Sequence, residues 1–386
     1  MQPAQHTKQI QPSYIREILK AASAEGVMSL AGGLPATEQM PMQLISDALR
    51  QLTDQRELFQ YGESRGLKPL TDYLREQLQL PAEHQLLITN GSQQGLDLIA
   101  RSFINPGDGV ALEVPAYLGA SQVFQLAGAQ LFPLRQTRDG PDLEQLETLF
   151  ANGKIKLFYS VPDFHNPTGV VWSAQTRQEV ARLCRHYGIA LIEDAPYRQL
   201  RFTGEQQITM SSLYPEATLS LHSYSKIAFP GMRLAAVSGP DSWLETLLKI
   251  KQASDLHTAL PLQQLLYTLL SHTKFSCHIE SLQRLYRQRY QALAYAIKQW
   301  LSPEFSFTEV EGGMFLWLEI PGVDSLQVAR QALQAGVAVV PGEPFYPDAL
   351  RCQAGTIAPA LRLNFSNSSA EDLSLAVQRL QPLLSH

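Results

Sequence analysis

The feature that most constrains the fold is a regular alternation of short apolar runs with longer helical patterns between residues 85 and 237. Apolar runs of about four residues predict strands, and the amphipathic stretches between them predict helices. The predicted strands are Leu86–Thr89, Val110–Glu113, Leu131–Leu134, Leu157–Ser160, Ile189–Ile192, Leu219–His222 and Leu234–Val237. The predicted helices are Ser92–Phe103, Leu118–Leu126, Asp142–Phe150 and Ser173–Tyr187. This alternation predicts an α/β fold in which helices sandwich a mostly parallel sheet.

The pattern differs on both sides of this region, which indicates further domains. The first residues are irregular, with a short predicted helix at Ser13–Ala21 and another at Pro41–Leu52. A long helical pattern covers Pro261–Trp300, and mixed elements follow it: strands Phe315–Glu319, Val337–Val340 and Leu361–Phe365, and helix Leu326–Ala335. For a chain of 386 residues we expect an N-terminal arm at 1–45 that packs with the small domain. A large domain would then span 46–280 and a small α+β domain 281–386.

Composition excludes several classes of protein. Hydrophobic residues make up 45% of the chain and charged residues 17%, as in a folded globular protein, and the net charge is −5. Because there is no surplus of basic residues, nucleic-acid binding is disfavoured, and no apolar run is long enough to predict a membrane span. The cysteines (Cys184, Cys277 and Cys352) are scattered, without the spacing of a disulfide framework or a zinc site. We therefore expect no metal and a cytoplasmic location.

Chemically useful residues follow the predicted strands, where ligands bind in open α/β sheets. After the first strand, Gly91 frees a turn and Ser92 is the predicted N-cap of a helix whose N–H groups can hold an anion. An ordinary helix cap explains the same residues. Tyr117 follows the second strand, where it can stack on a planar ring or simply pack.

Polar residues also follow the later strands. Asn166 lies in the turn His165-Asn166-Pro167-Thr168-Gly169. Asp194 ends a strand, and a carboxylate there needs a cationic partner, which a protonated ring nitrogen or an arginine would supply. Lys226, in Ser223-Tyr224-Ser225-Lys226, lies between two apolar strands. A lysine in a partly desolvated cleft has a lowered pKa and can act as a nucleophile or base.

Taken together, these motifs resemble the class I aminotransferases of fold type I, which depend on pyridoxal 5′-phosphate. The resemblance is strongest to the branch that includes 2-aminoadipate aminotransferases and the C-terminal domains of MocR regulators. It extends from Ser13 to the C-terminus, and its further motifs are Ser29-Leu30-Ala31-Gly32-Gly33-Leu34-Pro35, Glu193-Asp194-Ala195-Pro196-Tyr197 and Pro230-Gly231-Met232-Arg233. It implies a large cofactor-binding domain with a mostly parallel sheet and a smaller α+β domain.

The resemblance also implies roles toward the cofactor. Lys226 would bind pyridoxal 5′-phosphate covalently and later move a proton, while Asp194 would pair with the pyridinium nitrogen. Asn166 and Tyr197 would hydrogen-bond the phenolic oxygen, and Tyr117 would stack on the ring. The residues that would hold the phosphate are Ser92, Gln93, Ser223, Ser225 and Arg233.

Substrate and subunit roles come from the same resemblance. Arg362 would bind the substrate α-carboxylate in a two-pronged way, assisted by Asn166 and the backbone of Gly33. Arg16 would meet a side-chain carboxylate, which favours glutamate or 2-aminoadipate as amino donor, although a broad specificity fits equally well. Tyr61 would reach the phosphate in a neighbouring subunit, which implies a homodimer.

We therefore expect an aminotransferase that exchanges an amino group between an L-amino acid and a 2-oxo acid, with 2-oxoglutarate as acceptor. A β-lyase or decarboxylase that uses the same cofactor is an alternative, because these reactions differ only in which bond at the substrate Cα breaks. A second alternative is a ligand-sensing module like those of MocR regulators. About 28 residues precede the Ser29-Leu30-Ala31-Gly32-Gly33 motif, which is short for a DNA-binding domain.

Overall fold

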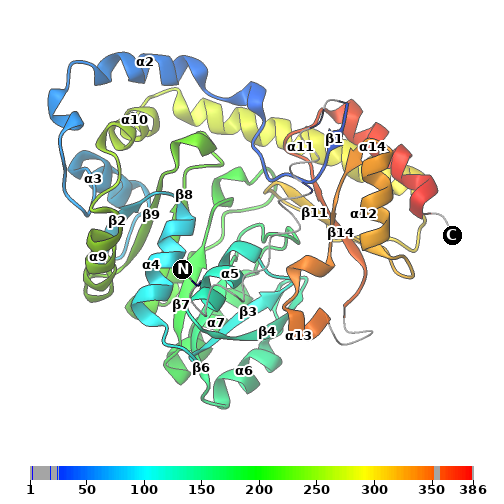
Figure 1. Cartoon of the computed structure of the whole chain (residues 1–386), viewed down its shortest axis with the longest axis horizontal. Coiled ribbons are helices and arrows are strands. Elements are labelled where there is room, and N and C mark those ends of the chain that lie inside the picture. Colours follow the sequence, from blue (N-terminus) through cyan, green and yellow to red (C-terminus); the bar gives the residue numbers. More distant parts are fainter. Residues whose placement is uncertain (1, 3–17, 19–23, 25, 352–356, 385–386) are drawn as a thin grey trace.

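The chain forms a large sheet and a small sheet, each flanked by helices, and the long helix α11 (Phe275–Trp300) extends along the outside from the large part to the small part (Figure 1). The computed structural model describes residues 2, 18, 24, 26–351 and 357–384. The predicted helix Ser13–Ala21 and Arg16 therefore lie outside the described residues, apart from Ile18.

The large sheet has eight strands and is mostly parallel, as predicted. In spatial order they are β2 (His84–Thr89), β9 (Ala235–Pro240), β8 (Thr218–Ser223), β7 (Ala190–Asp194), β6 (Ile155–Ser160), β3 (Gly109–Val114), β4 (Gln130–Thr137) and β5 (Gly140–Pro141). Neighbouring strands from β8 to β4 pair in parallel, whereas β9 and β5 run against their neighbours. The carboxyl ends of β6, β7 and β8 therefore meet at one edge of the sheet.

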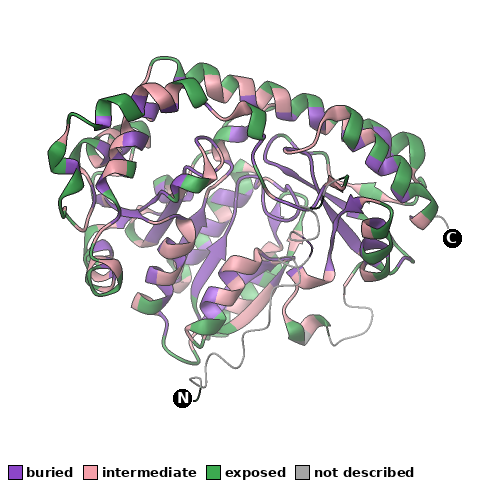
Figure 2. Ribbon diagram, turned by 45° about the horizontal axis from the view of Figure 1, so that its top comes forward, coloured by how far each residue is buried: buried purple, intermediate pink, exposed green. Residues whose placement is uncertain are grey.

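Helices cover both faces of this sheet, which explains why its central strands are continuous apolar runs. One face packs against α4 (Ser92–Phe103), α5 (Leu118–Leu126) and α9 (Asp241–Asp255). The other packs against α6 (Leu143–Ala151), α7 (Ala174–Tyr187) and α8 (Met210–Leu213). Along β3, Val110 and Leu112 belong to the first core and Ala111 to the second, as the twofold period of a strand requires. Figure 2 shows these strands buried between exposed helical surfaces.

Local signals set several helix ends. The Ser173 hydroxyl accepts a 3.1 Å hydrogen bond from the backbone N–H of Thr176 at the start of α7, and Gly188 ends that helix in a left-handed conformation. The prediction that Ser92 caps α4 is wrong. Gly91 occupies the N-cap position, with φ of 86°, and Ser92 is the first helical residue. A glycine takes that place because the turn needs a positive φ.

The C-terminal part contains the small antiparallel sheet. Its strands in order are β10 (Ser306–Phe307), β11 (Phe315–Glu319), β14 (Ala360–Asn364) and β13 (Val340–Pro341). Helices α12 (Ser325–Gln334) and α14 (Ala370–Leu384) pack beside it. A separate parallel pair joins β1 (Met28–Ser29) to β12 (Val337–Ala338), so these two residues are attached to the C-terminal part of the chain. The domain boundaries near 45 and 280 stay a prediction.

Two predicted elements are divided in the structure. The pattern Pro261–Trp300 forms two helices, α10 (Leu260–Leu270) and α11 (Phe275–Trp300). Between them the backbone N–H of Lys274 donates to the His272 ring instead of to a helical carbonyl. The predicted strand Val337–Val340 is shared between β12 and β13, which belong to different sheets.

The remaining elements are short or weakly patterned. Helix α2 (Met42–Leu52) agrees with its prediction, whereas α3 (Lys68–Gln77) was not predicted because only Leu70 and Leu74 are buried on it. The short elements are η2 (Thr37–Gln39), η3 (Arg56–Phe59), η4 (Arg198–Leu200), η5 (Pro215–Ala217), η6 (Pro230–Met232), η7 (Glu343–Phe345) and α13 (Asp348–Arg351). No helix within the described ranges is long and apolar enough to cross a membrane.

Candidate active site

The predicted site residues gather where the carboxyl ends of the large-sheet strands face the small sheet. Asp194 is the last residue of β7 and Ser223 the last of β8, and Lys226 follows three residues later. Asn166 lies in the loop after β6. Arg362 comes from β14 of the small sheet and reaches Asn166. The edge predicted from strand order is therefore one wall of the site, and the small sheet provides the opposite wall.

Asp194 is a buried carboxylate with one oxygen unpartnered. Its side chain is 3% exposed, and Oδ2 accepts a 2.8 Å hydrogen bond from the hydroxyl of Tyr159. The other oxygen, Oδ1, is buried and has no hydrogen-bond partner. Burial raises the pKa of Asp194 to about 7, against the opposing effect of the Tyr159 hydrogen bond. Leaving such an oxygen without a donor is costly, so this site suits a cationic N–H, such as a protonated pyridine nitrogen.

Lys226 carries a reactive amine. Its Nζ donates a 2.7 Å hydrogen bond to the carbonyl oxygen of Gly33. Removal of the amine from water, together with the positive charges of Arg362 and Arg233, lowers the pKa of Lys226 to about 8. A substantial fraction of the amine is therefore neutral near physiological pH, which is what a lysine needs to attack an aldehyde.

Arg362 is held rigidly in a buried position. Its Nη1 donates to Oδ1 of Asn166 at 3.0 Å, and its Nη2 donates to the carbonyl oxygen of Ala31 at 2.6 Å. The rings of Phe315 and Phe345 flank the guanidinium carbon, with centroids 4.3 and 5.1 Å away. Burial lowers the pKa of Arg362 to about 10, and its buried Nε has no partner. The group remains a cation at neutral pH and has N–H donors left for an anion such as a carboxylate.

A second anion-binding feature lies at the start of α4. Gly91 adopts φ of 86°, and a Cβ atom there would lie 2.5 Å from Nη2 of Arg233, so the guanidinium lies directly against the turn. Gln93 donates from Nε2 to the carbonyl oxygen of Gly119 at 2.9 Å and accepts a 3.2 Å hydrogen bond from the Tyr117 hydroxyl. A helix N-terminus with an adjacent guanidinium suits a phosphate.

The other predicted residues have different environments. Ser223 and Ser225 are linked by a 3.4 Å hydrogen bond from the backbone N–H of Ser225 to Oγ of Ser223. Tyr197 is buried and hydrogen-bonded to Asn166, and burial raises its pKa above its ordinary value. Tyr61 is 80% exposed and meets only the edge of the His257 ring among the ring contacts of the described chain, at 5.8 Å between centroids. Within one described chain it does not join the other site residues.

Three residues of the site were missed by sequence reasoning. Tyr159 was interpreted only as part of an apolar strand, although it hydrogen-bonds Asp194. Phe315 and Phe345 were not connected with Arg362, and no local pattern indicates that they flank it. Among the residues that the structure describes, no group of three or more His, Cys, Asp or Glu side chains could hold a metal ion.

A lysine of lowered pKa, a buried aspartate with a free oxygen, and a helix N-terminus beside a guanidinium are the groups that a pyridoxal-phosphate enzyme needs. The family model described as aminotransferase class I and II matches residues 25–380. The chain belongs to this family, and it is a pyridoxal-phosphate-dependent aminotransferase, with amino acids and 2-oxo acids as substrates.

Relatives with named activities cover nearly the whole chain. A 2-aminoadipate transaminase of Thermus thermophilus is 36% identical, with 96% of this chain and 93% of the relative covered. An aromatic-amino-acid aminotransferase of Thermococcus litoralis is 32% identical, over 95% of this chain and 90% of the relative. The crystal structure of a kynurenine aminotransferase of Pyrococcus horikoshii is 31% identical, with a TM-score of 0.93 and coverage of 99% and 96%. These names agree on the reaction and differ in the amino acid.

Proposed function

We propose that this aminotransferase transfers the amino group of glutamate or 2-aminoadipate, with 2-oxoglutarate as the acceptor 2-oxo acid. The observation that carries the proposal is Arg362, a buried guanidinium aligned by Asn166 and with donors left over. Every amino acid and 2-oxo acid carries the carboxylate that such a group binds. The similarity to a 2-aminoadipate transaminase favours an acidic amino acid. A broader specificity is the second candidate, favoured by the similarity to an aromatic-amino-acid aminotransferase.

The residues of the site divide the chemical work. When bound, pyridoxal phosphate supplies an electron sink for the charge that develops at the substrate Cα. Lys226 would hold the cofactor through its amine and would accept, at Nζ, the proton removed from the substrate Cα. Asp194, whose Oδ1 has no partner in the protein, would accept from the ring nitrogen and keep it protonated. Asn166 and Tyr197 would donate to the phenolic oxygen, and Tyr117 would stack on the ring.

Two cationic regions bind the anionic ends of the cofactor and substrate. Ser92, Gln93, Ser223 and Ser225, with Arg233, hold the phosphate at the N-terminus of α4. Arg362 binds the substrate α-carboxylate, with help from Asn166 and the backbone of Gly33. Arg16, outside the described residues, binds the side-chain carboxylate of an acidic substrate.

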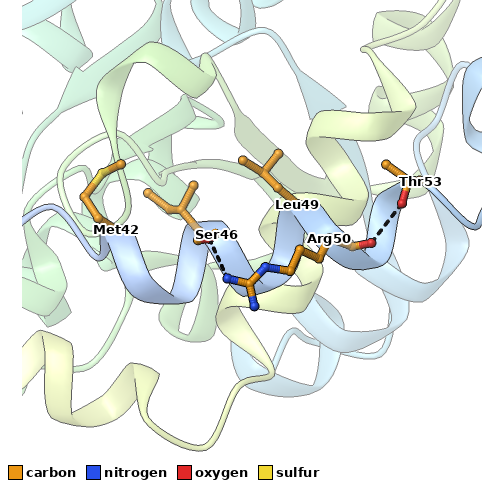
Figure 3. A pocket seen from close by; sticks show the side chains of 6 residues that line it. Met42, Ser46, Leu49, Arg50 and Thr53 are labelled. Carbon is orange, nitrogen blue, oxygen red and sulfur yellow. Dashed lines mark hydrogen bonds between the residues drawn. The ribbon is translucent and has the colours of Figure 1, made fainter.

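A homodimer completes the site, with Tyr61 reaching the phosphate in the partner subunit. Support comes from the exposed apolar side chains on and near α2: Met42, Leu49, Phe59 and Tyr61. Helix α2 also lines a hollow of about 570 Å³ (Figure 3). None of the residues proposed for catalysis lines this hollow, which suits a docking surface for a second copy better than a substrate pocket.

The cellular location and the domain division are also proposed. The proposed cytoplasmic location rests on the sequence, whose scattered cysteines do not have the spacing of a disulfide framework. The division into an arm at 1–45, a large domain at 46–280 and a small domain at 281–386 is supported by the separate sheets.

An absorbance titration tests the function. The purified protein with pyridoxal phosphate should show the visible band of the lysine-bound cofactor. Glutamate or 2-aminoadipate should convert it to the shorter-wavelength amine form, and 2-oxoglutarate should restore it. Lys226→Ala should lack the visible band. Bleaching by aromatic or aliphatic amino acids alone would contradict the role of Arg16, and absence of any band would contradict the proposal as a whole.

A further inference from the structure

We propose that Phe164 is a positioning residue whose ring, seated against Gly312 and Gly313, holds Asn166 in register with Arg362. This inference deepens the carboxylate-binding site and rests on the proposed function. Phe164 lies two residues before Asn166 in the loop after β6. Its proposed effect acts through Asn166, which lies in the same loop.

The backbone of Phe164 is unusual. Its φ is 56°, in the left-handed region that residues with a side chain rarely adopt, and its side chain is 1% exposed. Such a conformation persists only where the surroundings enforce it, and it is concentrated at functional sites. The preceding residue is firmly anchored, because the Asp163 carboxylate accepts hydrogen bonds from Arg177 at 2.9 Å and from Arg198 at 2.7 Å. These two hydrogen bonds hold Asp163 in place and so restrict the position of the adjacent Phe164.

The ring lies in a seat that two glycines create. A Cβ atom on Gly312 would collide with the far end of the Phe164 ring. Gly313 has φ of 73°, and a Cβ atom on it would lie 2.6 Å from the Cβ of Phe164. Neither position can accept a side chain unless Phe164 moves, so the close approach requires glycine at both.

The glycine segment is itself attached to the large domain. The backbone N–H of Gly313 donates to the carbonyl oxygen of Leu200 at 3.2 Å. The guanidinium of Arg201 lies 4.8 Å from the centre of the Phe164 ring and also forms an ion pair with Glu311. The ring is thus enclosed between the glycines and a cation, which leaves it little freedom to shift.

This arrangement links both partners of the carboxylate site. Strand β11 begins at Phe315, two residues after Gly313, and pairs with β14, which carries Arg362. A shift of that strand pair would therefore shift the Phe164 ring, and a shift of Phe164 would move Asn166. The outcome is the 3.0 Å hydrogen bond between Asn166 and Arg362. If Phe164 were only a core residue, its loss would lower stability without moving that contact.

Two variants and two matched controls separate these roles in the holoenzyme. Phe164→Leu removes the ring and keeps an apolar side chain, and Phe150→Leu removes an equally buried ring from the core beneath α6. Gly313→Ala adds a methyl group that displaces Phe164. Gly322→Ala is its control, because Gly322 has a similar φ of 79° but nothing within 4 Å of the added Cβ.

Three measurements are made on all four variants. The first is the dissociation constant of glutarate, a dicarboxylate that cannot be transaminated. The second is the pair of KM and kcat for the amino donor, and the third is the melting temperature. Loss of an aligned hydrogen bond to a charged group corresponds to about a ten- to hundredfold weaker binding of the carboxylate. We expect that increase in glutarate dissociation constant and KM for Phe164→Leu and Gly313→Ala, with kcat changed less. The controls should lower the melting temperature and leave both constants unchanged.

Crystal structures of Gly313→Ala and Gly322→Ala test the inference independently of the reaction. The Asn166–Arg362 hydrogen bond should be broken in the first and retained in the second. Its retention in Gly313→Ala, or equal changes of KM in Phe164→Leu and Phe150→Leu, would overturn the positioning role. A wild-type enzyme that neither binds glutarate nor exchanges amino groups would contradict the proposed function instead, and the crystal structures would still decide whether Phe164 positions Asn166.

Discussion

Nη1 of Arg362 donates a 3.0 Å hydrogen bond to Oδ1 of Asn166, although the two residues are 196 positions apart. Asn166 lies in the loop that follows β6 of the large sheet, and Arg362 lies on β14 of the small sheet. The proposed carboxylate site therefore exists only where the two sheets meet. A movement of one sheet against the other would therefore change the distance between Asn166 and Arg362 at the proposed carboxylate site.

Replacement of Arg362 by lysine should weaken substrate binding. Lysine keeps the charge but loses the planar, two-pronged donor set and the fit between Phe315 and Phe345. We expect KM for both amino acid and 2-oxo acid to rise about ten- to hundredfold, with a smaller effect on kcat. Steady-state kinetics with each substrate varied in turn measures this. An unchanged KM together with an unchanged melting temperature would show that another residue binds the carboxylate.

The cofactor-free protein should become less stable as pH rises, because of Asp194. Its pKa of about 7 lies above that of an exposed aspartate, so the folded state holds the proton more tightly than the unfolded state. The free energy of unfolding therefore falls between about pH 4 and pH 7. Relative to Asp194→Asn, which cannot titrate, the wild type should lose about 3 kcal/mol between pH 5 and pH 8.

Urea unfolding of both cofactor-free proteins at several pH values measures this difference. A parallel series with pyridoxal phosphate bound is the control, because a cation on the free Oδ1 should remove the penalty for ionising Asp194. Parallel pH profiles for the two cofactor-free proteins would mean that the carboxylate is already ionised without a partner.

Gly91→Ala should weaken cofactor binding. The added methyl group meets the Arg233 guanidinium at 2.5 Å, and the residue must also keep a positive φ. Gly107→Ala is a matched control, since Gly107 has φ of 94° and nothing within 4 Å of the new Cβ. Equilibrium dialysis with pyridoxal phosphate should show a dissociation constant raised at least about tenfold for Gly91→Ala alone, as expected when a charge-assisted contact is lost. Equal affinities of the two variants for pyridoxal phosphate would contradict the proposal that Arg233 binds the phosphate.

Tyr61 and Lys226 should complement each other between subunits. If Tyr61 serves the partner's site, a mixed dimer of Tyr61→Ala and Lys226→Ala chains contains one intact site. Each variant alone should have little activity, and refolding them together should restore up to about a quarter of the wild-type rate, from the statistics of random pairing and one active site per mixed dimer. No recovery, with mixed dimers shown to form, would place Tyr61 in its own subunit's site or outside catalysis.

The sequence alone predicted much of the fold, because its signals are local. Helices α4 and α5 and strand β11 have the predicted bounds, since amphipathic spacing and turn residues act over a few neighbours. Polar residues at successive strand ends, such as Asp194, were placed on one edge because parallel strands share a direction. The family's motifs then indicated the cofactor.

Tertiary structure decided what depends on contacts between distant segments. It divided Val337–Val340 between two sheets, and it brought Tyr159 to Asp194 and the rings of Phe315 and Phe345 to Arg362. No periodicity in the sequence predicts these side-chain contacts, because they depend on how distant segments of the chain pack against each other. The residue types and their strand ends are local properties of the chain, whereas the pairing of Asn166 with Arg362 arises only when the sheets are docked.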